Sequence, residues 1–286
     1  MSHNKFKLVE CPRDAMQGLH DFVPTALKAE YLNLLLQVGF DTLDFGSFVS
    51  PKAIPQMADT AEVLAQLDFN NTSTKLLAIV ANLRGVEDAV KHRAIDYLGF
   101  PFSISETFQQ RNTNSSISQS LNTVEEMLSV CAKNNKKAVV YLSMGFGNPY
   151  DDEWNYEIVE KWADVLVDKG VEILSLADTV GVSTPEKIES ILPKLISRFS
   201  NTEIGIHLHS TPAERFEKIE AAYLSGVKRI DSALKGFGGC PMAADDLTGN
   251  IATEDVIDYL NAKGENLNLN MGKWNEAMAL SGKVFG

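Results

Sequence analysis

Residues 171–209 read VEILSLADTVGVSTPEKIESILPKLISRFSNTEIGIHLH and contain one complete copy of the pattern that decides the fold. The apolar run VEILSLADT comes first, a segment of helical period follows, and the apolar run EIGIHLH ends the stretch. Between the first run and the helical segment, Thr184 can cap a helix with its hydroxyl, and Pro185 suits the first helical position. The stretch therefore predicts a strand, a helix and a second strand parallel to the first.

The same alternation recurs along the whole chain. Eight apolar runs are expected as strands: 7–11, 42–48, 75–80, 94–100, 138–144, 171–179, 203–209 and 229–234. Amphipathic segments lie between many of them: 25–38, 121–132, 156–169, 185–198 and 213–224. This order predicts an α/β fold, a (β/α)8 TIM barrel, and no linker divides residues 1–286, so we expect a single domain. A doubly wound open sheet is the alternative, but its G-x-G-x-x-G fingerprint is missing after the first run.

Composition and charge exclude several classes of function. The 286 residues carry 26 Lys and Arg against 38 Asp and Glu, a net charge of −12. A field of this sign repels phosphate backbones, so we expect no nucleic-acid partner. No apolar run reaches the ~18 residues that span a bilayer, and the first residues contain no apolar signal core, so we expect no membrane association. The odd and small number of cysteines argues against a disulfide framework and favours the cytoplasm.

Polar side chains follow the predicted strands, and in a barrel the chemistry lies where the strands end. His207 and His209 are two residues apart in a strand, so both point to the same face and can bind one divalent metal ion. Asp14, after the first strand, would complete the ligand set. The alternative is a pair of independently hydrogen-bonded core histidines. The carboxylates of Asp14 and Asp178, expected on the same rim, favour the metal site.

The cysteines and the Arg13–Asp14 pair each have two interpretations. Cys240 lies in GFGGCP, whose glycines permit the motion of a lid over an active site, although a free thiol in an ordinary loop is the alternative. Cys131 falls on an apolar helical face and is expected in the core. Cys11 is expected to pack near the site rather than to act as a nucleophile. Arg13 beside Asp14 is either a simple ion pair or part of the site.

Several motifs follow one another in an order that resembles a known family. They are ECPRDAMQG, SFVSPKAIPQM, YLSMGFGNPY, LSLADTVGVSTP, HLH and GFGGCPMAADDLTGNIATED. Together they are similar to the 3-hydroxy-3-methylglutaryl-CoA (HMG-CoA) lyase family, part of the metal-dependent lyase and condensing-enzyme barrels. The resemblance spans about residues 7–262. The GGCP motif points to the lyase branch.

The resemblance implies a homodimeric barrel that binds Mg²⁺ or Mn²⁺ and cleaves an acyl-CoA, HMG-CoA, to acetyl-CoA and acetoacetate, a step of leucine degradation. By motif match, the metal ligands would be Asp14, His207, His209 and Asn250. Catalytic roles would fall on Arg13, which stabilises the enolate, on Cys240, which helps to protonate it, and on Asp44, Asp178 and His207. The positions near the substrate would be Gln17, Tyr141, Ser175 and Thr179. Arg111 is a candidate for a CoA phosphate, with a solvated loop arginine as the favoured alternative.

Five features depart from the lyase pattern and leave the acyl group open. They are Asp44 in place of Glu, Ser210 in place of Asp after H-x-H, Val139 in place of an arginine, a first motif shortened by one residue with Ala15 for a glycine, and one residue inserted between Cys240 and Asn250. A related metal-dependent aldolase, or an acyl-CoA condensing transferase acting on another hydroxy acid, is the alternative enzyme. A non-catalytic barrel that binds a metabolite is the third hypothesis.

Overall fold

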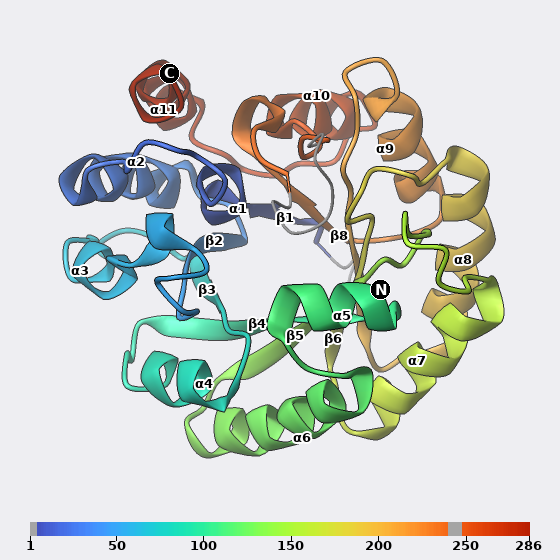
Figure 1. Ribbon diagram of the computed structural model, residues 1–286. Helices are drawn as coiled ribbons and strands as arrows, with labels where there is room; N and C mark the ends of the chain where they lie inside the picture. The colour runs from blue at the N-terminus through green and yellow to red at the C-terminus, as the bar shows by residue number, and fades with distance from the viewer. Residues whose placement is uncertain (1–4, 240–247) are drawn as a thin grey trace.

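The computed structural model describes residues 5–239 and 248–286 and contains a closed barrel of eight parallel strands. The strands follow in chain order and β8 pairs with β1, so the predicted (β/α)8 barrel is confirmed and the open sheet is excluded. Their bounds are β1 Lys7–Glu10, β2 Thr42–Ser47, β3 Lys75–Ile79, β4 Ile95–Ser103, β5 Lys137–Ser143, β6 Ile173–Ala177, β7 Glu203–His207 and β8 Arg229–Ser232. Figure 1 looks along the barrel, with the strands surrounded by helices.

The larger helices surround the barrel, and shorter ones lie at its C-terminal end. They are α1 Pro12–Met16, α2 Thr25–Val38, η1 Pro55–Met57, α3 Thr60–Leu64, α4 Leu83–Ala89, α5 Glu106–Thr113, α6 Ile117–Lys133, α7 Tyr156–Asp168, α8 Pro185–Arg198, α9 Arg215–Leu224, η2 Leu234–Gly236, α10 Thr253–Ala262 and α11 Met271–Val284. In the described ranges, no helix is both long enough and apolar enough to cross a bilayer.

Local sequence explains where the helices begin. The bounds of α8 match the prediction, with the Thr184 hydroxyl accepting from the Lys187 N–H and Pro185 at the first position. Helix α6 begins four residues before the predicted start at Leu121. Ser116 forms a capping box with Gln119 there, and this polar start lies outside the apolar periodicity on which the prediction depended.

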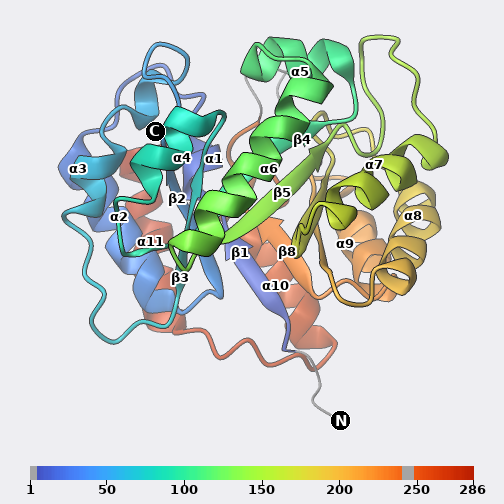
Figure 2. The ribbon, with the colours of Figure 1, turned by 90° about the horizontal axis from the view of Figure 1, so that it is seen from below.

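The barrel is closed to solvent at its N-terminal end, which leaves one end for a site. Tyr97, Val139 and Ile173 are inward-facing members of a small apolar cluster that fills the interior. Below them Arg229 is fully buried, with Glu203 at 3.4 Å and Asp41 at 3.9 Å. In Figure 2 the strands rise between the helices, and α5 lies beyond the C-terminal end of β4.

Glu10 is a buried carboxyl on the outer face of β1. It accepts hydrogen bonds from the Leu234 N–H at 2.8 Å and from the Thr253 hydroxyl at 2.5 Å. Burial raises its pKa to about 8, although both hydrogen bonds oppose the shift. The folded protein therefore holds a proton on Glu10 at a pH where the unfolded chain has lost it.

Because the folded state binds this extra proton, the free energy of unfolding should fall as the pH rises from about 4.5 to about 8, by at most about 1.4 kcal/mol per pH unit. Glu10→Gln keeps an acceptor for Leu234 and cannot ionise, so it should remove this part of the pH dependence. Urea unfolding at pH 5 and pH 8 measures it, with the exposed Glu87→Gln as the matched control. Equal pH slopes for Glu10→Gln and the wild type would contradict the assignment.

Candidate active site

A pocket of about 380 Å³ opens at the C-terminal end of the barrel. Arg13, Asp14, His207 and His209 line one part of it, and residues of α5 including Arg111 line another. Helix α1 lies inside the ring of larger helices, beside β1 and β2, so its charged residues reach the pocket (Figure 1). The pocket is where the sequence predicted chemistry, at the ends of the strands.

Asp14, His207 and His209 come together as a group that could hold a metal ion. One ligand atom from each lies within 4.8 Å of the others, and all three residues are buried. Nε2 of His207 lies 3.1 Å from Nε2 of His209. The two rings point to the same place because His207 ends β7 and His209 follows two residues later.

The hydrogen bonds of the two imidazoles favour a cation between them. His207 Nδ1 lies 3.3 Å from Asp231 Oδ2, and His209 Nδ1 lies 2.8 Å from the Thr248 carbonyl oxygen. Both partners accept, so the neutral rings carry their hydrogens on Nδ1 and present a lone pair on Nε2. Two such lone pairs repel each other at 3.1 Å unless a proton or a metal ion lies between them.

Asn250 adds a fourth candidate ligand to this group. Residues 249–251 run beside the segment after β7, where Gly249 accepts from the Ser210 N–H and the Ile251 N–H donates to Leu208. Asn250 Nδ2 donates to Asp14 at 2.7 Å, while its buried Oδ1 has no hydrogen-bond partner among the described residues. A buried amide oxygen without a partner, next to a carboxylate and two imidazoles, fits a divalent cation.

Gly238 permits this close approach of Asn250. Its φ is +103°, and a Cβ there would lie 2.7 Å from Asn250 Nδ2 and 2.9 Å from the Asp14 carbonyl oxygen. The glycine-rich segment thus has a packing role at the site. Cys240, the predicted loop thiol, lies outside the described residues.

Electrostatics keep Asp14 and His209 in the forms that bind metal. Burial raises the pKa of Asp14, but the charges of Arg13 and the two imidazoles outweigh it and lower that pKa to about 2. Burial and the charge of His207 lower the pKa of His209. For His207, burial lowers the pKa, but Asp231 and Asp14 outweigh it and the net shift is upward. At neutral pH the group is an ionised carboxylate beside at least one neutral imidazole.

Arg13 is held by two carboxylates at the edge of the pocket. Its Nε and Nη2 donate to Asp44, the shortest contact being 2.6 Å, and Nη1 donates to Asp14 and Gln17. One of the two Nη2 hydrogens remains for a substrate oxygen. Burial raises the pKa of Asp44 to about 6, although Arg13 opposes the shift. Asp44 itself does not line the pocket, so its contact with the pocket passes through Arg13.

The other predicted site residues fall in different places. Gln17, Tyr141 and Thr179 line the pocket, whereas Ser175 and Asp178 do not. The Asp178 carboxylate accepts from the Ser183 hydroxyl at 2.6 Å and from the backbone N–H groups of Val182 and Ser183, so it organises the turn before α8. The catalytic role of Asp178 and the substrate contacts of Ser175 therefore remain predictions.

Two residues near the site were missed in the sequence. Asp231 contacts His207 from β8, and Lys218 is fully buried with its Nζ donating to the His209 carbonyl at 3.0 Å. Asp231 could have been found in the sequence, because it is an acidic residue at an inward-facing position of the apolar run RIDSAL. Arg111 lines the pocket and stacks over Tyr150, with its guanidinium carbon 5.1 Å from the ring centroid.

Comparison with known proteins gives the family of this barrel. The HMGL-like family model matches residues 5–280. The chain belongs to the HMGL-like family. It is 35% identical over 272 residues to the cytoplasmic 3-hydroxy-3-methylglutaryl-CoA lyase of Rattus norvegicus, covering 95% of this chain and 78% of the relative. It is 34% identical to hydroxymethylglutaryl-CoA lyase YngG of Bacillus subtilis, covering 93% and 90%. The predicted membership is confirmed.

Solved structures agree with this family. The HMG-CoA lyase of Bacillus subtilis superposes with a TM-score of 0.91 at 31% identity, over 98% of this chain and 94% of that one. The HMG-CoA lyase of Acinetobacter baumannii, solved with coenzyme A and 3-methylmalate, gives a TM-score of 0.90 at 28% identity, over 99% and 92%. The carboxyl transferase domain of Rhizobium etli pyruvate carboxylase shares only the fold, at 15% identity and a TM-score of 0.73.

The unpartnered oxygen of Asn250 leads to a prediction for metal affinity. Asn250→Ala removes this oxygen and the hydrogen bond to Asp14, so it should weaken Mn²⁺ binding by about 10–100-fold. Titration of free Mn²⁺ by electron paramagnetic resonance measures the affinity. Asn148→Ala, in the loop before α7, is the control and should bind Mn²⁺ like the wild type. Undiminished affinity in Asn250→Ala would exclude Asn250 as a ligand.

Proposed function

We propose that this HMGL-like lyase cleaves HMG-CoA to acetyl-CoA and acetoacetate with the help of Mg²⁺ or Mn²⁺, as in leucine degradation. The observation that carries the proposal is the convergence of the Asp14, His207 and His209 ligand group with the Arg13 guanidinium at one edge of the pocket. The substrate named for the curated relatives supports the choice of acyl-CoA.

The metal site would be formed by Asp14, His207, His209 and Asn250. A bound divalent cation would supply a Lewis acid that lowers the pKa of the substrate's 3-hydroxyl and fixes its orientation. The carboxylate and amide oxygens of Asp14 and Asn250 are ligands that suit Mg²⁺ and Mn²⁺.

Cleavage of the C2–C3 bond requires a base for the 3-hydroxyl proton. Asp14 is too weak a base, since its pKa is about 2. Asp44, with a pKa of about 6, and His207, with a raised pKa, have suitable values. His207 lines the pocket, whereas the Asp44 carboxylate lies behind Arg13. A metal-bound imidazole whose Nδ1 carries a hydrogen has no lone pair left for this proton. We therefore assign the proton to His207 only in the form whose Nε2 is free of the cation, with Asp14, His209 and Asn250 as the remaining ligands, and we assign to Asp44 the positioning of Arg13.

Arg13 stabilises the negative charge that develops when the bond breaks. The electron pair of the C2–C3 bond passes to the thioester and forms an enolate, whose oxygen can take the remaining Nη2 hydrogen of Arg13. Asp44 and Gln17 hold the guanidinium in place beforehand, so little reorganisation is needed. By resemblance, Cys240 would then help to protonate the enolate carbon.

The remaining assignments belong to the same proposal. Arg111, at the pocket and stacked on Tyr150, is the candidate for a CoA phosphate. We propose one catalytic domain over residues 1–286 and a homodimer by resemblance to the family. A cytoplasmic location is supported by the name of the rat relative and by the sparse cysteines.

The direct test is to incubate the purified protein with HMG-CoA and Mg²⁺ or Mn²⁺ and to measure acetoacetate and acetyl-CoA. We expect equal amounts of both and no product with His207→Ala. A condensing transferase would instead release free CoA thiol together with a new acid from an acyl-CoA and a keto acid. Failure to exceed the His207→Ala control with either metal, across a panel of 3-hydroxyacyl-CoA esters, would refute the proposal.

Arg13→Met should lower kcat by about 10²–10³-fold, because one charged donor to the developing oxyanion is lost. Mn²⁺ affinity should change much less, since Arg13 is not a ligand. Steady-state kinetics and Mn²⁺ titration on the same preparation separate the two effects. Arg84→Met, on an exposed face of α4, is the matched control. A loss of Mn²⁺ binding equal to the loss of kcat would assign Arg13 to the metal site instead.

A further inference from the structure

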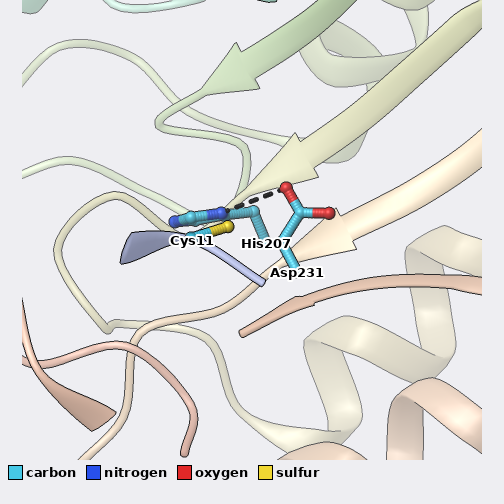
Figure 3. A group of neighbouring side chains, drawn as sticks. All are labelled: Cys11, His207 and Asp231. Carbon is cyan, nitrogen blue, oxygen red and sulfur yellow. Dashed lines mark hydrogen bonds and ion pairs between the residues drawn. The ribbon is translucent and has the colours of Figure 1, made fainter. Parts of the chain in front are cut away.

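A second group of ligand atoms lies inside the barrel, on the other side of the His207 ring. The inner cluster consists of Cys11 after β1, His207 at the end of β7 and Asp231 in β8 (Figure 3). One ligand atom of each lies within 4.8 Å of the others, and all three residues are buried. Of the three residues only His207 lines the pocket, so Cys11 and Asp231 lie behind its ring.

The geometry of the inner cluster suits a tetrahedral cation. His207 Nδ1 and Asp231 Oδ2 are 3.3 Å apart, which is long for a charge-assisted hydrogen bond. Two ligand atoms at about 2.0–2.1 Å from one tetrahedral Zn²⁺ lie about 3.3–3.4 Å apart. The Cys11 sulfur makes only a weak contact, 3.9 Å from the Val9 carbonyl, and lies within 4.8 Å of the ligand atoms of the other two residues.

Two buried polar atoms at or beside the inner cluster lack hydrogen-bond partners within the described part of the chain. Asp231 Oδ1 and the Tyr141 hydroxyl are buried and have no hydrogen-bond partner among the described residues. The Tyr141 ring lies 5.9 Å from the His207 ring, edge to face. A buried carboxylate oxygen without a partner is costly, and a cation removes that cost. A water can supply the fourth ligand.

We propose that the inner cluster is a second metal site, selective for a thiophilic divalent cation such as Zn²⁺ or Cd²⁺. The ligands are the Cys11 thiolate, His207 Nδ1 and the Asp231 carboxylate. On binding, the metal–sulfur bond replaces the S–H bond, and the thiol proton leaves to solvent. The thiolate and the carboxylate then balance the two positive charges. Mg²⁺ prefers the oxygen-rich group of Asp14 and Asn250, so ligand softness separates the two sites.

The two sites compete for one ring. A neutral imidazole binds a cation through one nitrogen and keeps its hydrogen on the other. If His207 uses Nδ1 for the inner site, its Nε2 carries the hydrogen and is lost to the group with His209. A thiophilic cation in the inner cluster therefore weakens cation binding at the pocket and inhibits the protein.

Titration with Cd²⁺ alone tests the inner site through the ultraviolet charge-transfer band of a cadmium thiolate. In the wild type we expect the band to saturate at one equivalent of Cd²⁺ per chain. The band should be lost in Cys11→Ser and retained in Cys131→Ser and Cys240→Ser. A band that survives in Cys11→Ser, or that disappears in Cys240→Ser, would overturn the proposal. The assay contains no substrate, so its outcome is independent of the proposed lyase activity.

Two further measurements guard against a variant that does not fold. Cadmium-edge X-ray absorption on the wild type should show one sulfur together with an imidazole, and a shell of oxygen and nitrogen alone would refute the site without any variant. Saturating Mn²⁺ should raise the apparent Kd for Cd²⁺ at least tenfold in the wild type. A Cd²⁺ titration that Mn²⁺ does not shift would refute the sharing of His207.

Discussion

The site depends on one constraint, the 3.1 Å separation of the two Nε2 atoms of His207 and His209. Acceptors on the far side of both rings fix the hydrogens on Nδ1, so the near side presents two lone pairs. That arrangement is stable only with positive charge between the rings. The same need for positive charge explains why the ionised carboxylate of Asp14 and the unpartnered oxygen of Asn250 lie beside the two rings. Strand β7 holds the rings in place.

Much of the fold was readable in the sequence because a barrel repeats a simple rule. Each buried parallel strand is a short apolar run, and each helix shows the 3.6-residue period, so residues 171–209 already indicated the architecture. The His207–His209 pair was predictable for a similar reason, since residues two apart in a strand share a face. Where local polar chemistry decides, as at the Ser116 capping box, periodicity alone misplaced the helix start.

The acidic residues were harder to assign from sequence, because a carboxylate at a strand end can face the pocket or the backbone. Asp178 turns to the N–H groups of the following loop, whereas Asp231, not singled out in the sequence, faces His207. Asp44 lies between these cases, since it reaches the pocket only through Arg13. The direction of each carboxylate depends on which donors the neighbouring strands and helices provide, and that is a three-dimensional property.

The buried carboxyl of Glu10 connects the outer face of β1 to the segment that carries Asn250. Leu234 and Thr253 lie on the two sides of the glycine-rich segment, and one carboxyl group accepts hydrogen bonds from both. Asn250 lies in that segment, only three residues before Thr253. Burying a carboxyl is costly, and its raised pKa shows that cost. Keeping the proton on Glu10 lets the barrel hold both ends of the segment without burying a negative charge there.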